Sequence, residues 1–166
     1  MTLAFKTAVL DLETTGFRST DRVIEVGVVL LDENLAVEDT WQTLVQPDRD
    51  IDNSHVHGIT ASDLVGAPRF SGIAAELAAL LDDRVLVAHN ARLDIDLPAA
   101  TAWSLCTRVL SRELLPGAPE RLSECLTCVG VHNALPHAAV ADAAATADLF
   151  RCLVTDHGAR CDDVRP

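Results

Sequence analysis

The sequence predicts an α/β domain built on a mixed five-stranded sheet with helices on its faces. The chain has 166 residues, about the size of one domain. Three apolar segments joined by short polar turns come first, and Pro47 ends the last of them. Helical and strand patterns then alternate, which packs helices against a sheet that includes parallel strands. The first three predicted strands cover residues 8–13, 23–31 and 40–46.

The rest of the chain alternates between the two kinds of element. A polar loop over 48–68 leads into it, and apolar residues then recur at helical spacing in four segments. Two short apolar segments between them are typical of buried strands. The predicted elements are helices over 71–82, 107–115, 122–129 and 140–154 and strands over 84–89 and 103–106. We therefore expect one domain over residues 1–155 and a loose tail over 156–166.

The chain is strongly acidic. Its 13 Lys and Arg residues stand against 25 Asp and Glu residues, which gives a net charge of −12. This balance argues against a broad basic surface that holds nucleic acid. It leaves open a site in which carboxylates bind divalent cations and the cations meet the phosphate.

The sequence predicts neither export nor membrane insertion. No segment approaches the roughly 18 consecutive apolar residues of a membrane span. Residues 1–6 lack the basic and apolar regions of a signal peptide. Five cysteines is an odd number for a disulfide-bonded protein. We therefore expect a cytoplasmic protein with reduced thiols and no membrane partner.

Two acidic side chains stand two residues apart in the first predicted strand. Asp11 and Glu13 point to one face of this strand, while Leu10 and Leu12 point into the core. Neighbouring carboxylates repel each other, and a divalent cation is the simplest compensation. Oxygen ligands suit Mg²⁺ or Mn²⁺. The alternative interpretation is a strand end with a solvated acidic face.

A second segment supplies another carboxylate. Asp94 follows the buried strand over 84–89, at the end of a strand where sites form in such sheets. Asp96 is a competing candidate two residues further on. His89, at the end of the same strand, fits a packing or capping role as well as it fits a ligand role.

The last predicted helix carries the third segment. Asp142 shares a helical stripe with Leu149 and Leu153, which predicts a buried carboxylate, whereas Asp148 falls on a solvent stripe. His137 lies just before this helix, where its imidazole reaches the same place as Asp142 and suits a general base. Four carboxylates and one histidine from three segments are the groups that two-metal phosphodiester hydrolysis requires.

Three motifs resemble the DEDDh branch of the DEDD superfamily of 3′–5′ exonucleases, which includes the proofreading epsilon subunit of bacterial replicative DNA polymerase. The motifs are Val9–Gly16, Val87–Asp94 and His137 followed after four residues by Asp142. The segments His57–Thr60 and Cys106–Arg112 are also similar to segments of this family. The resemblance spans about residues 8–153, nearly the whole chain.

The resemblance implies an RNase H-like fold and the metal-dependent release of nucleoside 5′-monophosphates from a 3′ end. It assigns His137 as the general base. The ligands of two Mg²⁺ or Mn²⁺ ions would be Asp11, Glu13, Asp94 and Asp142. The substrate-binding residues would be Thr14, Thr15, Phe17 and His57. The alternative roles are a turn-anchoring aromatic for Phe17 and a loop-capping histidine for His57.

The chain departs from the family pattern in three places. The segment between Asp94 and Trp103 and the loop before His57 are short, and Leu93 replaces an aromatic residue. We still expect the metal chemistry, on single-stranded or frayed DNA 3′ ends, with a DNA polymerase as a candidate partner. The alternatives are an exonuclease for RNA ends and a weakly active module that binds nucleic acid or a polymerase. Sugar preference depends on pocket shape, so it stays open, as does the oligomeric state.

Two other signals favour structural roles. Cys125 and Cys128 form a lone C-x-x-C pair in a predicted helix, without the second pair that a zinc site usually needs. Trp41 and Trp103 lie on predicted strands, which favours core packing over base stacking.

Overall fold

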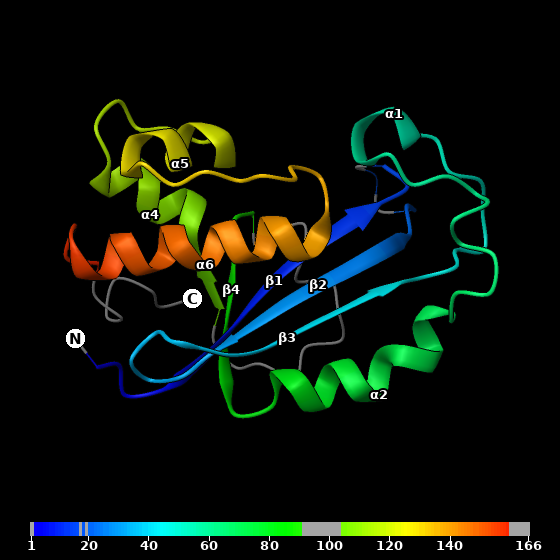
Figure 1. The fold of residues 1–166 in the computed structure, drawn as a ribbon, viewed down its shortest axis with the longest axis horizontal. Helices are drawn as coiled ribbons and strands as arrows, with labels where there is room; N and C mark the ends of the chain where they lie inside the picture. Colours follow the sequence, from blue (N-terminus) through cyan, green and yellow to red (C-terminus); the bar gives the residue numbers. More distant parts are fainter. Residues whose placement is uncertain (1, 17, 19, 91–103, 160–166) are drawn as a thin grey trace.

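A mixed five-stranded sheet forms the centre of the protein (Figure 1). The computed structural model describes residues 2–16, 18, 20–90 and 104–159. The strands are β1 (Lys6–Thr14), β2 (Val23–Leu31), β3 (Val37–Leu44), β4 (Arg84–Ala88) and β5 (Ser104–Cys106). They lie in the order β3-β2-β1-β4-β5. β1, β2 and β3 pair antiparallel, whereas β1, β4 and β5 pair parallel.

Helices cover both faces of this sheet. They are α1 (Ser54–His57), α2 (Phe70–Leu81), α4 (Thr107–Leu114), α5 (Leu122–Val129) and α6 (Ala139–Thr155). α6 packs on one face with α4 and α5 beside it, and α2 packs on the other (Figure 1). Among the described helices, none has both the length and the apolar character that crossing a bilayer requires.

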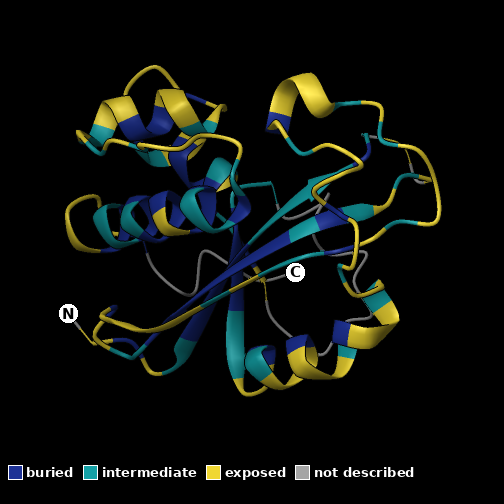
Figure 2. Ribbon diagram, turned by 45° about the vertical axis from the view of Figure 1, so that its right-hand side comes forward, coloured by how far each residue is buried: buried dark blue, intermediate teal, exposed yellow. Residues whose placement is uncertain are grey.

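A hydrophobic core lies on each face of the sheet, and β1 contributes side chains to both. Val9 lies in the core under α6, Leu10 lies in the core under α2, and neither side chain is exposed to solvent. β2 is likewise buried along most of its length, whereas β3 at the edge of the sheet is largely exposed (Figure 2). The central strands therefore form a rigid base for the residues at their ends.

The predicted elements agree closely with the observed ones. The bounds of β2 and α5 are as predicted, while β3 begins three residues and ends two residues earlier than predicted. The structure adds detail in two places. The helical turn α1 forms within the predicted polar loop, because Gly58 closes it in a left-handed conformation (φ 74°). Ala159 in the predicted loose tail is buried, and its N–H donates to the carbonyl of Leu153 (2.9 Å).

The strand directions bring distant segments to one edge of the sheet. β1 and β4 are parallel, so their carboxyl ends lie at the same edge, and antiparallel β2 begins there. The short helix α1 lies beyond the carboxyl end of β1 (Figure 1). The amino end of α6 lies over β2 and β1, so it reaches this edge from the face above.

Candidate active site

The acidic pair of β1 has the predicted geometry. Leu10 is fully buried on the α2 side, and Leu12 packs partly buried against the same core. Asp11 and Glu13 alternate with them, so they lie on the opposite, α6-facing side, where both are half-buried. Both carboxylates therefore stand under the helix that carries the next predicted residues.

The neighbouring strand β2 explains why α6 comes so close. Asp11 lies opposite Gly27 and Glu13 lies opposite Glu25 in the antiparallel register. Gly27 has no side chain, and a Cβ placed there would overlap the backbone of Ala139. The first turn of α6 therefore lies directly on β2, beside the acidic pair.

α6 buries Asp142 as its helical stripe predicts. Asp142 is 8% exposed, and Leu149 and Leu153 on the same stripe are fully buried. Asp148 lies outside the stripe and forms an ion pair with Arg151. The two aspartates of one helix therefore have different environments, one in the site and one at the surface.

Glu13, His137 and Asp142 meet at the carboxyl end of β1. Each offers one ligand atom, and these atoms all lie within 4.8 Å of one another. This is the one such group of three or more acidic, histidine or cysteine side chains within the described ranges. Two carboxylates and an imidazole suit a divalent cation such as Mn²⁺, and the carboxylates alone suit Mg²⁺.

The backbone before α6 is held in an unusual conformation. His137 has φ 66°, in the left-handed region that residues other than glycine rarely adopt. Its N–H donates to Asp142 Oδ2 (3.1 Å), and the side-chain amide of Asn133 donates to Asp142 Oδ1. The carboxylate of Asp142 is therefore oriented by two donors, while the imidazole of His137 stays exposed to solvent.

The loop after β1 is built around Asp21. Its carboxylate accepts the Arg18 N–H (2.7 Å) and the Thr15 hydroxyl (3.3 Å), and it fills the space where a Cβ on Gly16 would lie. The bond from the Arg18 N–H, with smaller contributions from Thr15 and Arg49, holds the pKa of Asp21 below its usual 3.8. The Thr15 side chain thus belongs to the loop framework.

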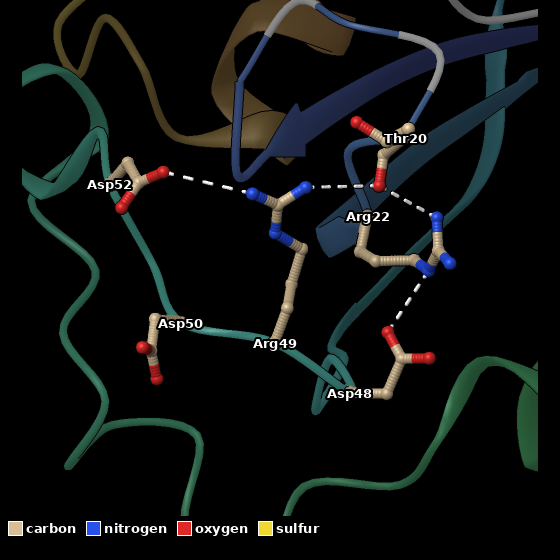
Figure 3. A pocket seen from close by; sticks show the side chains of 6 residues that line it. All are labelled: Thr20, Arg22, Asp48, Arg49, Asp50 and Asp52. Atoms are coloured by element: carbon tan, nitrogen blue, oxygen red, sulfur yellow. Dashed lines mark hydrogen bonds and ion pairs between the residues drawn. The ribbon is translucent and has the colours of Figure 1, made fainter.

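Two arginines connect this loop to the segment before α1 (Figure 3). Arg49 forms an ion pair with Asp21 (2.8 Å) and donates to the carbonyl of Thr20 (3.1 Å). Arg22 donates to the same carbonyl (2.8 Å) and pairs with Asp48 (3.0 Å). These contacts border an open polar hollow of about 740 Å³, whose lining residues are Thr20, Arg22, Asp48, Arg49, Asp50 and Asp52.

His57 combines a structural contact with an unused ring nitrogen. Its Nδ1 accepts the N–H of Ile59 (3.1 Å), which is the predicted loop-capping role. Its Nε2 is buried and has no hydrogen-bond partner among the described residues. Burial lowers the pKa of His57 below its usual 6.5, and the charges of His55 and His137 lower it further.

His89 has a structural role. Its Nε2 lies 3.0 Å from the carbonyl of Glu120, which can only accept, so Nε2 carries the proton. Its Nδ1 then accepts the hydroxyl of Thr107 (3.0 Å). Burial lowers the pKa of His89 below its usual 6.5 and favours this neutral form. With both ring nitrogens in use, His89 joins the end of β4 to α4.

Several predicted residues fall outside the described ranges. They are Phe17, Asp94, the competing Asp96 and the short segment up to Trp103. The structure therefore brings together Glu13, His137 and Asp142, with Asp11 on the same face of β1.

The remaining sequence signals have structural explanations. Cys125 is fully buried and its thiol donates to the carbonyl of Pro119 (3.7 Å), whereas Cys128 is exposed. Burial raises the pKa of the Cys125 thiol, which disfavours the thiolate that a metal requires. Trp41 packs partly buried against the α2 core and donates to Glu76 (3.0 Å).

Sequence reasoning missed the residues that hold α6 in place. Glu25 and Gly27 interrupt an otherwise apolar strand, and such interruptions often mark a polar contact or a close backbone approach. That pattern is the signal that could have identified them. Asn133 lies in an irregular segment and has no comparable signal.

The comparisons with known proteins agree with this geometry. A sequence model of a protein family described as exonuclease matches residues 8–150. The DNA polymerase III subunit epsilon of Treponema pallidum is 32% identical over an alignment of 164 residues that covers 89% of this chain and 75% of that protein. A PolC-type DNA polymerase III of Thermotoga petrophila is 30% identical over 155 residues. That match covers 86% of this chain but only 11% of the much longer polymerase.

A solved structure shows the same fold. Exonuclease X, in complex with 5′ overhanging duplex DNA, is similar with a TM-score of 0.81 and 23% identity. The similarity covers 94% of this chain and 95% of that chain. The predicted RNase H-like architecture is therefore confirmed.

Proposed function

The chain belongs to this exonuclease family, and from that premise we propose that it removes nucleoside 5′-monophosphates from 3′ ends of single-stranded or frayed DNA. The convergence of Glu13, His137 and Asp142 from two distant segments supports this proposal most directly. The domain and a phosphodiester substrate are both negatively charged. Divalent cations held at this cluster would offset the repulsion between them.

The proposed ligands of two Mg²⁺ or Mn²⁺ ions are Asp11, Glu13, Asp94 and Asp142. Such ions, when bound, supply positive charge to the attacking and leaving oxygens of the phosphodiester. The carboxylate of Asp142 is already oriented for this role, because the Asn133 side chain and the His137 backbone N–H both donate hydrogen bonds to it.

His137 is the proposed general base. Its imidazole is exposed beside the two carboxylates, so it can accept the proton of the attacking water. We expect His137→Gln to lower kcat by about 10²–10⁴ with little change in KM, because the base acts on the proton transfer. Single-turnover and steady-state kinetics measure the rate of cleavage and the affinity for substrate separately. An equal loss of rate and of affinity would assign His137 to substrate positioning.

The proposed substrate contacts are Thr14, Phe17 and His57. The buried Nε2 of His57 offers a hydrogen bond that no described protein group uses, which supports a substrate partner. The Thr15 hydroxyl and N–H both serve the loop, so we assign Thr15 to shaping the loop that presents Thr14.

The cellular setting is also a proposal. The match to the epsilon subunit of Treponema pallidum supports association with a DNA polymerase through the folded surface. Four described cysteines are free thiols, which fits a cytoplasmic location.

A cleavage time course tests the proposed function. We would incubate the protein with 5′-labelled single-stranded DNA and a matching RNA, each with Mg²⁺, Mn²⁺ or EDTA. We expect a ladder that shortens from the 3′ end, is faster on DNA, and disappears with EDTA and in Asp11→Ala. Immediate release of the labelled nucleotide would indicate the opposite polarity. Faster degradation of the RNA would favour the exoribonuclease alternative.

A further inference from the structure

Glu25 contacts the first residue of α6. Its Oε2 accepts the N–H of Ala139 at 2.9 Å, across 114 residues of sequence. This N–H is one of the first in the helix, which have no partner within the helix itself. The residue before the helix, Ala138, provides no side-chain cap. A carboxylate from the sheet thus takes the place of an ordinary helix cap.

Gly27 fixes the distance between the same two elements. Any side chain there would overlap the backbone of Ala139 and Val140. Gly27 and Glu25 point to the same face of β2, two residues apart. One therefore lets the helix start approach the sheet, and the other binds it there.

The Glu25–Ala139 contact lies close to both segments that contribute to the candidate metal cluster. Ala139 lies two residues after His137 and three before Asp142, while Glu25 lies directly opposite Glu13 in the sheet. Opposed residues of an antiparallel pair have Cβ atoms about 5 Å apart. The Glu25–Ala139 bond therefore joins the segment that carries His137 and Asp142 to the strand that lies beside Glu13.

We propose that Glu25 is a positioning residue that anchors the start of α6 and so sets the spacing of the proposed metal ligands Glu13 and Asp142, with the general base His137 beside them. The proposal rests on the proposed function insofar as that cluster binds the catalytic metal. Residues around metal ligands commonly act in this way, and their loss typically weakens metal binding about 10–100-fold.

Three substitutions of Glu25 distinguish a role in anchoring the helix from a role that depends only on its negative charge. Glu25→Gln keeps an acceptor of the same length without the charge. Glu25→Asp keeps the charge but falls short of the helix by about one carbon–carbon bond, roughly 1.5 Å. Glu25→Ala removes both. If Glu25 acts as an anchor, the glutamine variant stays within about threefold of the wild type, while the aspartate and alanine variants bind Mn²⁺ about 10–100-fold more weakly.

The measurement is the Mn²⁺ affinity of the full chain by electron paramagnetic resonance titration, with the melting temperature recorded for each variant. Glu113 is exposed on α4, so Glu113→Ala is a control with the same change of charge. We expect it to bind Mn²⁺ like the wild type. The steady-state rate on single-stranded DNA should follow the Mn²⁺ affinity through the Glu25 series.

The pattern of the three variants decides the outcome. Wild-type affinity in Glu25→Asp together with weak binding in Glu25→Gln would overturn the anchoring role, as would unchanged affinity in Glu25→Ala. Should Glu25→Ala fail to fold, the comparison of the glutamine and aspartate variants still decides between anchor and charge. A wild-type chain that binds no Mn²⁺ would instead overturn the proposed metal chemistry, and this inference with it.

Discussion

The two sides of the candidate site are held together by different kinds of contact. On the metal side, the backbone of α6 lies on Gly27 and a buried carboxylate is fixed by two donors. On the loop side, the loop after β1 is joined to the segment before α1 through Arg49, whose side chain is 34% exposed. Close packing barely responds to solvent conditions, whereas salt still weakens an ion pair with one partly exposed partner, though less than a fully exposed pair. The loop side should therefore be more sensitive to salt than the metal side.

The largest effect is expected on the metal side. Asp142→Asn removes a charge from the cluster while keeping the shape of the side chain, so we expect cleavage to fall by about 10³-fold or more. Asp148→Asn on the same helix is the matched control, because Asp148 pairs with Arg151 at the surface. Initial rates on labelled single-stranded DNA measure both. Comparable losses in the two variants would remove Asp142 from the site.

A smaller effect is expected from the contact between helix and strand. Gly27→Ala inserts a methyl group against the backbone of α6, and such overpacking costs about 1–3 kcal/mol. Gly72→Ala in α2 is the control, since a Cβ there meets only Pro68 at 3.8 Å. It should stabilise the protein by up to about 1 kcal/mol. Urea unfolding measures both, and equal stability of the two variants would contradict the tight contact at Gly27.

The loop side should respond more weakly and depend on salt. Arg49→Ala breaks the ion pair to Asp21 and the bond to Thr20, so we expect KM to rise about two- to fivefold with kcat nearly unchanged. The ratio of variant to wild-type KM should fall towards one as salt rises from about 0.05 to 0.5 M. Arg121→Ala, at a side chain that is 83% exposed, is the control. A loss confined to kcat would mean that Arg49 supports the metal side instead.

The smallest effect concerns pH. Burial lowers the pKa of His89 below its usual 6.5. At a pH just below 6.5, His89 is therefore protonated in the unfolded chain but stays neutral in the folded domain. The free energy of unfolding should therefore decrease as pH falls from about 6.5 towards the lower pKa, and His89 should contribute no pH dependence well above 6.5. Urea unfolding of the wild type and His89→Gln between about pH 5 and pH 8 measures the difference. His132→Gln, at an exposed histidine, should keep the wild-type slope.

Local pattern was enough to predict one side of the site. The helical period alone placed Asp142 on the buried stripe and Asp148 outside it, because both properties depend only on residues of the same helix. Period-two alternation likewise placed Asp11 and Glu13 on one face. The contacts that position these groups depend on tertiary packing. Glu25 meets a residue 114 positions away, so nothing near it in the sequence identifies its partner.

The sequence left two roles open for His89 for the same reason, because its contacts depend on tertiary packing. Its role depends on the carbonyl of Glu120, which lies 31 residues further along the chain. The fold itself was easier to predict, because strong apolar periods fix the elements, and the weakly patterned, exposed strand β3 shows the largest shift of its bounds.

The left-handed backbone at His137 places two selective pressures in opposition. A residue with a Cβ loses about 1 kcal/mol in this conformation, and glycine avoids that loss. Selection for folding alone would therefore favour glycine at this position, whereas selection for proton transfer requires an imidazole. Evolution in the laboratory towards higher thermal stability, without a screen for turnover, should drift away from histidine here and leave a well-folded but inactive chain.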